Sequence, residues 1–433
     1  MELHTDVCLA VDDIYLPAEG VDMSKWAVVA CDQYTSEPEY WHEVEREVGD
    51  APSTLGLIYP EAFLDEGDAR IAEINARMRR YLSEGVLVPR VHGFVLVERE
   101  CEHGARVGLV APVDLEAYDF EAGSRSPVRA TEGTILERIP PRVRIRRGAC
   151  IELPHIMMLL DDYERTVIEP LYEMRESLEK LYDFDLMQGG GHIRGWAVEG
   201  EAVEFVLGAM AELRARSGDI FIAVGDGNHS LATARQCWLD MRDSLTPEQR
   251  ENHPARFALC ELVNLHSDAL VFEPVHRVLF GADMGVLVRD FGAWCERGGM
   301  KMERGARAGH VFRFVNGASN MAVTVTGSRY PIDVGTLQSF LDEWVKLHPE
   351  VKLDFVHGEQ SLRQLASREG CCGVLLEPMD KRTLFPAVEQ GGALPRKTFS
   401  MGEAHEKRFY LECRRIDGGD AAAQPADDAA AAE

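Results

Sequence analysis

Long apolar runs are absent from this 433-residue sequence. No segment approaches the roughly 20 consecutive apolar residues that a helix needs to cross a bilayer. Residues 1–11 contain acids and a histidine, whereas a secretory signal begins with basic residues followed by an apolar run. These absences predict a cytoplasmic protein without a membrane partner.

Paired cysteine motifs and positive charge are also scarce. The ten cysteines include the adjacent Cys371 and Cys372 but no C-x-x-C spacing, so we expect reduced, mostly buried thiols. The 46 Lys and Arg residues face 73 Asp and Glu residues, which gives a formal net charge of -27. Nucleic-acid binding depends on clustered basic residues that neutralise phosphates, so we expect no nucleic-acid partner.

The remaining composition is that of a globular protein, with 45% hydrophobic and 27% charged residues. The chain is too long for one ordinary core, so two domains are expected, with three as the upper limit. We predict a mixed α/β fold with one domain over residues 1–280 and a C-terminal α/β region over residues 281–416. Residues 417–433 contain little that can be buried and are predicted to form a disordered tail.

Periodicity predicts alternating strands and helices. Strands are expected at residues 26–30, 219–224 and 257–264, and a hairpin is expected from residues 94–98 and 106–111. Helices are expected at residues 66–82, 163–181, 202–216 and 230–241. Residues 118–147 show little periodicity and many Arg, Pro and Thr residues, which predicts a long functional loop.

The turn at residues 225–230 joins the strand at 219–224 to the following helix. Gly225 and Gly227 allow the backbone to turn tightly, and the first amides of the helix suit a phosphate or carboxylate. Asn228 or Ser230 is expected to cap the helix. Asp226 could hold Mg²⁺ or accept a proton, and His229 could donate a hydrogen bond to the same anion. The alternative is a plain turn in which Asp226 and Asn228 serve the backbone.

A second candidate is the basic segment at residues 129–147. It contains Thr131-Glu132-Gly133-Thr134 followed by five arginines, Arg138, Arg142, Arg144, Arg146 and Arg147. Guanidinium groups bind phosphates through paired hydrogen bonds, so the segment predicts either a polyphosphate pocket or a solvated stretch that balances nearby acids. Beside such charges Glu132 should stay ionised, fit for holding a metal or accepting a hydroxyl proton.

Two shorter motifs complete the set. Glu273-Pro274-Val275-His276-Arg277 follows a buried run, and Leu394-Pro395-Arg396-Lys397-Thr398 lies near the C-terminus. From the residues alone, either motif could be a plain loop. The glycines at 189–191 lack the Lys and Ser or Thr of a Walker loop, so they predict a flexible connection.

In this order the motifs resemble the bacterial and archaeal family catalogued as domain of unknown function 1015 (DUF1015). Its members carry an Asp-Gly-His-His-Arg turn followed by Thr-Ala, which here becomes Asp226-Gly227-Asn228-His229-Ser230 and then Thr233-Ala234. The family's His-Glu-x-x-Thr, Pro-Thr-His-Arg and Met-Pro-x-Lys-Ser/Thr segments resemble residues 131–134, 274–277 and 394–398, and its Tyr-Asp pair appears as Cys31-Asp32. The changed turn marks a divergent branch.

The resemblance implies a fold related to that of partition proteins and sulfiredoxin, and a kinase of free L-serine that takes phosphate from ATP or ADP. Mg²⁺ is expected because phosphoryl transfer generally needs it. In this hypothesis the backbone at Gly225, Gly227, Asn228 and Ser230 holds phosphate. The charge is neutralised by Arg138, Arg277 and Lys397, with His276 nearby. Asp226 or Glu132 holds the metal, and the other, or Asp32, accepts the hydroxyl proton. A metal-dependent phosphohydrolase or nucleotidase and a nucleotide-binding sensor without turnover remain alternatives.

Overall fold

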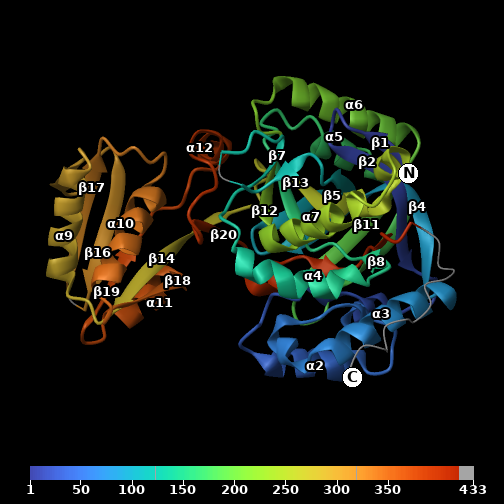
Figure 1. The fold of residues 1–433 in the computed structure, drawn as a ribbon, viewed down its shortest axis with the longest axis horizontal. Coiled ribbons are helices and arrows are strands. Elements are labelled where there is room, and N and C mark those ends of the chain that lie inside the picture. Colours follow the sequence, from blue (N-terminus) through green and yellow to red (C-terminus); the bar gives the residue numbers. More distant parts are fainter. Residues whose placement is uncertain (122, 318, 419–433) are drawn as a thin grey trace.

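Two lobes make up the structure, a computed structural model that describes residues 1–121, 123–317 and 319–418 (Figure 1). Over these residues the larger lobe is built on an eleven-stranded sheet and the smaller lobe on a seven-stranded sheet. The smaller lobe, coloured orange, stands to the left of the larger one in Figure 1. The predicted mixed α/β class is therefore confirmed.

The large sheet is mostly antiparallel, with parallel pairing at β9–β13, β12–β7 and β7–β6. From edge to edge its strands are β10 (Lys180–Asp185), β11 (His192–Val198), β4 (Leu87–Cys101), β2 (Leu9–Pro17), β5 (Gly104–Asp114), β13 (Phe257–Asn264), β9 (Met157–Leu160), β12 (Ile222–Asp226), β7 (Val128–Ala130) and β6 (Tyr118–Asp119). β1 (Glu2–His4) adds to β2.

Helices cover both faces of this sheet because side chains alternate along its strands. Leu96 and Leu109 enter a core with α5 (Ile168–Glu173), α6 (Glu201–Arg216) and α7 (Asn228–Arg242). Val95 and Val110 point to the opposite core, which is closed by α1 (Met23–Trp26), α2 (Pro38–Val48) and α3 (Asp68–Ser83). α4 (Ile139–Arg147) packs against α7, and α8 (Pro247–Asn252) follows α7 in the chain.

The small sheet carries its own helices around an aromatic core. Its strands are β15 (Lys301–Arg304), β17 (Ser319–Thr326), β16 (His310–Asn316), β19 (Cys371–Leu375), β14 (Phe272–Phe280) and β18 (Lys352–His357), with β20 (Phe399–Met401) beside the start of β14. The helices are α9 (Met284–Arg297), α10 (Asp333–Leu347) and α11 (Glu359–Ala366), while α12 (Leu384–Gly391) lies between the two lobes (Figure 1). Phe291 of α9 contacts the rings of Phe312 and Phe340.

After the small lobe the chain returns to the large one. β21 (Phe409–Tyr410) pairs with β3 (Val28–Val29), and β22 (Arg414–Arg415) pairs with β8 (Ile151–Glu152). One hydrophobic cluster continues across both lobes, since Leu159 and Ala223 of the large sheet share it with Phe399 and Met401. The two lobes therefore share part of one hydrophobic core.

The division predicted after residue 280 stays a prediction. Because β14 joins the small sheet and residues 409–415 pair within the large lobe, we propose crossings near residues 271 and 402. Most of the predicted tail, residues 419–433, lies outside the described residues. Within the described part, no helix combines the length and apolar character that crossing a membrane requires.

Three element predictions need correction. Residues 26–30 begin at the end of a short helix that Asp22 caps, so the strand is confined to Val28–Val29. The helix predicted at 163–181 is confined to Ile168–Glu173, because residues from Lys180 onward pair as β10 with β11. The loop predicted at 118–147 contains β6, β7 and α4, and Pro140 and Pro141 lie in the first turn of α4, where a missing amide needs no partner.

Candidate functional site

The pairing of three strands brings distant polar residues to one edge of the large sheet. β7 and β12 run parallel, so Glu132 follows β7 at the edge where Asp226 ends β12. β9 runs antiparallel to β12 with Asp226 opposite Met157, which brings His155, just before β9, to the same edge. A bridge between Glu132 and Leu394 adds the segment that contains Lys397.

The glycines of the turn serve the backbone geometry. Gly225 lies where the register between β12 and β9 shifts, and a Cβ there would be 2.9 Å from side-chain atoms of Leu159. Gly227 has φ of +83°, a left-handed conformation that favours glycine. Gly227 is also the N-cap of α7, which begins at Asn228 and has no side-chain cap. The expectation that Asn228 or Ser230 caps the helix is therefore wrong, since both lie inside its first turn.

Asp226 forms an ion pair with Lys407, a residue from the returning C-terminal segment. Lys407 Nζ lies 3.1 Å from Asp226 Oδ2 and also donates to the carbonyl oxygen of Met401 at 2.9 Å. The amide of Gly227 donates to Asp226 Oδ1 at 2.9 Å. Burial acts to raise the pKa of Asp226, but Lys407 and the Gly227 amide outweigh it and lower the pKa below its usual value.

Glu132 is the second carboxylate of the site and has the opposite pKa shift. Burial raises the pKa of Glu132, and the negative charge of Asp226 adds to this rise. The backbone amides of Lys397 and Thr398 and the charge of Lys397 oppose the rise without cancelling it. The Thr398 amide donates to Glu132 Oε1 at 3.3 Å. The predicted effect of the arginines at residues 138–147 on Glu132 is wrong, because the side-chain charges that act most strongly on its pKa are those of Lys397 and Asp226.

Arg277 holds the segment that carries Lys397. Its guanidinium is fully buried and donates to the carbonyl oxygens of Lys397 at 2.9 Å and Arg396 at 3.4 Å, and to Gln338 Oε1 at 3.0 Å. Burial lowers the pKa of Arg277 to about 10, which leaves it charged at neutral pH. Lys397 itself has φ of +57° and an exposed side chain, so this brace positions the lysine beside Glu132.

His276, the neighbour of Arg277, lies within the small lobe. Its Nδ1 accepts a hydrogen bond from the Leu376 amide at 3.2 Å, and its side chain is buried. Burial lowers the pKa of His276, so the ring is neutral at neutral pH. The hydrogen bond of the His276 ring therefore joins β14 to the residue after β19, and not to Asp226 or Glu132.

His229 joins the first turn of α7 to the loop that follows Glu132. Its Nε2 accepts a hydrogen bond from the Ile135 amide at 3.1 Å. Two polar atoms in these joined segments, Asn228 Oδ1 and Thr134 Oγ1, are buried and have no hydrogen-bond partner among the described residues. Buried polar atoms are rarely left unpaired, so these two call for a ligand or a water molecule.

His155, which the sequence analysis did not identify, joins Ser230 in a further part of the site. Ser230 Oγ lies 2.7 Å from His155 Nε2, and His155 Nδ1 lies 2.9 Å from the hydroxyl of Tyr410. The same hydroxyl accepts a hydrogen bond from the Cys31 amide at 3.2 Å. Asp32 is close enough for its charge to help raise the pKa of Tyr410, after the larger effect of burial.

The sequence model of the family described as "Protein of unknown function (DUF1015)" matches residues 15–344. The chain belongs to this family. The search of curated proteins found no match.

Several solved structures resemble this member of the DUF1015 family at low sequence identity. Free serine kinase in complex with AMP is 12% identical, with 70% of this chain and 90% of that chain covered at a TM-score of 0.38. A variant of free serine kinase in complex with ADP is 11% identical, with coverages of 70% and 91% and a TM-score of 0.39. A conserved hypothetical protein from Pyrococcus furiosus is 10% identical, with coverages of 71% and 94% and a TM-score of 0.35.

In this family member the basic segment is not a free phosphate pocket. α4 directs its arginines to acids of neighbouring elements: Arg142 pairs with Glu61, Arg144 with Asp68, Arg146 with Glu152 and Arg147 with Asp240. This outcome matches the alternative in which the segment balances nearby acids. The side chain of Arg138 lies outside the described part of the structure.

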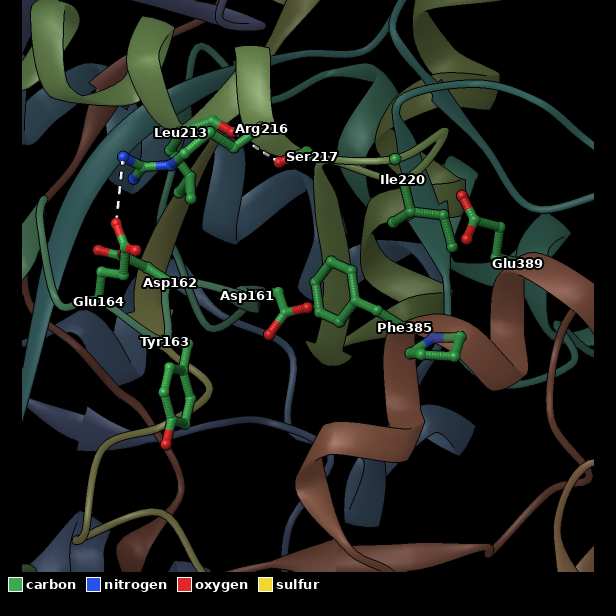
Figure 2. A pocket seen from close by; sticks show the side chains of 12 residues that line it. Asp161, Asp162, Tyr163, Glu164, Leu213, Arg216, Ser217, Ile220, Phe385 and Glu389 are labelled. Carbon is green, nitrogen blue, oxygen red and sulfur yellow. Dashed lines mark hydrogen bonds and ion pairs between the residues drawn. The ribbon is translucent and has the colours of Figure 1, made fainter.

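Two cavities lie away from the Asp226 edge. One of about 270 Å³ lies between the end of β9, the end of α6 and α12, where Figure 2 shows Phe385 pointing toward Asp161 and Arg216 paired with Glu164. The other, of about 510 Å³, lies between α2 and α3. Among the described residues no group of three or more His, Cys, Asp or Glu side chains could hold a metal on its own.

Proposed function

We propose that the chain is a phosphotransferase that moves a phosphoryl group from a nucleotide to the hydroxyl of a small metabolite, with free L-serine as the first candidate acceptor. The observation that carries this proposal is that two carboxylates meet at the first turn of α7, Asp226 in an ion pair with Lys407 and Glu132 under the charge of Lys397. Phosphoryl transfer asks a protein mainly to position its reactants and neutralise charge.

The first turn of α7 and the two lysines supply positive potential. The helix has 15 residues and no capping side chain, so its first-turn amides and the positive end of its dipole face the strand edge. Lys397 and Lys407 add full charges at the same place. In this proposal the amides of Asn228 and Ser230 hold phosphate oxygens, and the lysines neutralise the charge that develops on the leaving group.

The unpartnered atoms favour an acceptor that carries both an amino group and a hydroxyl. Asn228 Oδ1 is a pure acceptor and would take a hydrogen bond from an ammonium group. Thr134 Oγ1 can donate to, or accept from, a carboxylate or hydroxyl. A free amino acid with a hydroxylated side chain presents these groups together, which supports serine over a simple sugar or polyol.

The opposite pKa shifts of the two carboxylates divide their roles. Glu132, with its raised pKa, is suited to accept the proton of the acceptor hydroxyl, because a base works best when its pKa approaches the operating pH. Asp226, with its lowered pKa, keeps its charge. The described contacts of Asp32 are a hydrogen bond from Gln33 and a charge effect on Tyr410, so we give it no direct role in proton transfer.

Mg²⁺ fits this arrangement as an ion that arrives with the nucleotide. Such an ion needs only one or two carboxylates, since phosphates and water molecules supply its other ligands. Asp226, which keeps its charge, provides such a carboxylate, although no described cluster could hold the ion without a nucleotide. When bound, Mg²⁺ would neutralise charge on the phosphate oxygens.

The test is a product assay on the purified chain with ATP or ADP, Mg²⁺ and a panel of single hydroxylated metabolites. Phosphorylated products are identified by mass spectrometry. Asp226→Ala removes the paired carboxylate, and Asp243→Ala, an exposed substitution at the far end of α7, serves as the matched control. We expect O-phosphoserine from the wild type and from Asp243→Ala, and none from Asp226→Ala.

The same assay separates the other activities. Free phosphate without a phosphorylated metabolite would identify a phosphohydrolase or nucleotidase that places water where the acceptor hydroxyl should lie. Nucleotide binding without any product would identify a sensor. Either result would contradict the proposed transfer reaction.

A further inference from the structure

We propose that Ser230 itself accepts the phosphoryl group, so that transfer runs in two steps through phosphoserine at position 230. This inference rests on the proposed function and adds a covalent intermediate to it. It starts from the contact between Ser230 Oγ and His155 Nε2, whose atoms lie 2.7 Å apart at the edge that also carries Asp226 and Lys407.

The environment of His155 sets it up as the base for this serine. The hydroxyl of Tyr410 lies 2.9 Å from Nδ1 and also accepts the Cys31 amide at 3.2 Å, which fixes the position of the hydroxyl. The ring of Tyr410 meets the ring of His155 edge-on, with centroids 5.3 Å apart. When Nδ1–H donates to Tyr410, Nε2 is left unprotonated and accepts the hydrogen bond from Ser230. A hydroxyl hydrogen-bonded to such a base is an activated nucleophile.

The position of Ser230 also suits the modified side chain. It is the third residue of α7, so a phosphate on its oxygen would lie beside the first-turn amides and the positive end of the helix dipole. Asp226 would repel that phosphate, but its charge is paired with Lys407 at 3.1 Å. Ser230 is half-buried, which leaves it open to a ligand.

In the first step Ser230 Oγ attacks the terminal phosphorus of the nucleotide. The Oγ–P bond forms, and the bond from that phosphorus to the bridging oxygen breaks. The bridging oxygen leaves with the electron pair, and the Oγ proton moves to His155 Nε2. Lys397 and Lys407 face the charge that remains on the released nucleotide.

In the second step the hydroxyl oxygen of the acceptor attacks the same phosphorus. A new O–P bond forms, the P–Oγ bond breaks, and Ser230 Oγ takes its proton back from His155. The proton of the acceptor hydroxyl moves to Glu132, whose raised pKa suits it to this role. The protein is thereby returned to its starting state once Glu132 releases its proton to solvent.

The test begins with the full chain, ATP and Mg²⁺ in the absence of an acceptor, followed by intact-mass measurement and peptide mapping. We expect one phosphoryl group on Ser230, which moves to L-serine when serine is added. Ser230→Ala should carry no label. His155→Gln should be labelled about 100-fold more slowly, since it lacks the base. Ser244→Ala, which changes an exposed serine just after the same helix, should behave as the wild type.

The stereochemistry at phosphorus gives a readout that does not depend on accumulation of the intermediate or on the stability of the variants. With a nucleotide whose terminal thiophosphate is chiral, two displacements give retention of configuration and a single direct transfer gives inversion. Retention supports the proposal. Inversion, or full activity of a folded Ser230→Ala variant, overturns it while the phosphotransferase function stands. If neither labelled Ser230 nor a phosphorylated product forms, the intermediate and the phosphotransferase function are both overturned. If the label on Ser230 passes only to water, the intermediate is supported and the kinase function is excluded.

Discussion

The ammonium group of Lys407 lies 3.1 Å from the carboxylate of Asp226, at the edge of the large sheet where α7 begins. Arg99 fixes the segment that carries this lysine, because its buried guanidinium donates to the carbonyl oxygens of His405 at 2.6 Å, Glu406 at 3.1 Å and Lys407 at 2.6 Å. Desolvation lowers the pKa of Arg99 to about 9, which still leaves it charged at neutral pH. The interior of the large lobe therefore sets the geometry of the site.

Replacing Glu132 with Gln should reduce turnover without reducing stability. The Gln side chain keeps an oxygen for the Thr398 amide but cannot accept the substrate proton, so we expect a loss of about 100-fold or more in kcat. A carboxyl whose pKa is raised on folding destabilises the folded state as pH rises from about 4, near its unfolded pKa, through the raised folded pKa. Thermal unfolding at several pH values should therefore show that the stability of Glu132→Gln relative to the wild type increases as pH rises. A variant that loses stability at neutral pH would contradict this reading of Glu132.

The pH dependence of kcat in the wild type should show the titration of Glu132. A base must be deprotonated, so kcat should fall as pH drops through the raised pKa of Glu132. Asp226, with its lowered pKa, should titrate at more acidic pH, so it should not affect the fall in kcat caused by Glu132. A pH–rate profile with saturating substrates measures this. A flat profile down to the usual range of a free glutamate would exclude Glu132 as the base.

Replacing Gly227 with Ala should strain the turn that begins α7. The residue has φ of +83°, and a Cβ would lie 3.0 Å from the Ile156 side chain. We expect a loss of about 1–2 kcal/mol in the free energy of unfolding, and weaker nucleotide binding, because the first-turn amides shift. Gly133→Ala is the matched control, since no atom lies within 4 Å of its added Cβ and its φ is not positive. Urea denaturation and calorimetric titration of ADP measure the two effects, and equal behaviour of both variants would count against the role of the turn.

Replacing Arg277 with Ala should lower the stability of the fold and release Lys397 from its position. Arg277→Ala leaves the carbonyl oxygens of Arg396 and Lys397 and the side chain of Gln338 without their donors in a buried place. We expect unfolding to become easier by about 3 kcal/mol and nucleotide binding to weaken as Lys397 is released. Arg396→Ala removes an exposed arginine of the same segment, whose guanidinium lies 5.4 Å from the centroid of the Phe355 ring, and should change little. Chemical denaturation and activity assays on both variants measure these effects. An equal loss of stability in Arg277→Ala and Arg396→Ala would contradict the proposed role of Arg277.

Local patterns predicted the parts of the site that depend on neighbours in the chain. The strand at residues 257–264 was predicted with the bounds that the structure gives to β13, because a continuous apolar run between polar turns needs no knowledge of its partners. The glycines and Asp226 were found for the same reason, since a strand, a turn and a helix start lie within a few residues.

Lys407 and His155 escaped the sequence analysis because their place depends on contacts between distant segments. His155 reaches the edge only because β9 pairs antiparallel with β12, and Lys407 reaches it only because the chain returns from the small lobe. The arginines of α4 also depend on distant segments. Their charge density fitted a phosphate site as well as a segment that balances nearby acids, and only the fold shows that acids of α3, β8 and α7 pair with them.

The measurement that tests the central claim most directly is the rate of phosphoryl transfer from nucleotide to serine in the wild type and in Lys407→Met. Lys381→Met is the matched control, since Lys381 is also half-buried and donates to a backbone carbonyl, that of Ser267 at 2.7 Å. We predict a loss of about 100-fold or more in kcat/KM for Lys407→Met with its fold intact by circular dichroism, and no such loss for Lys381→Met. Transfer at the wild-type rate by a folded Lys407→Met variant would contradict the assignment of this edge as the catalytic site.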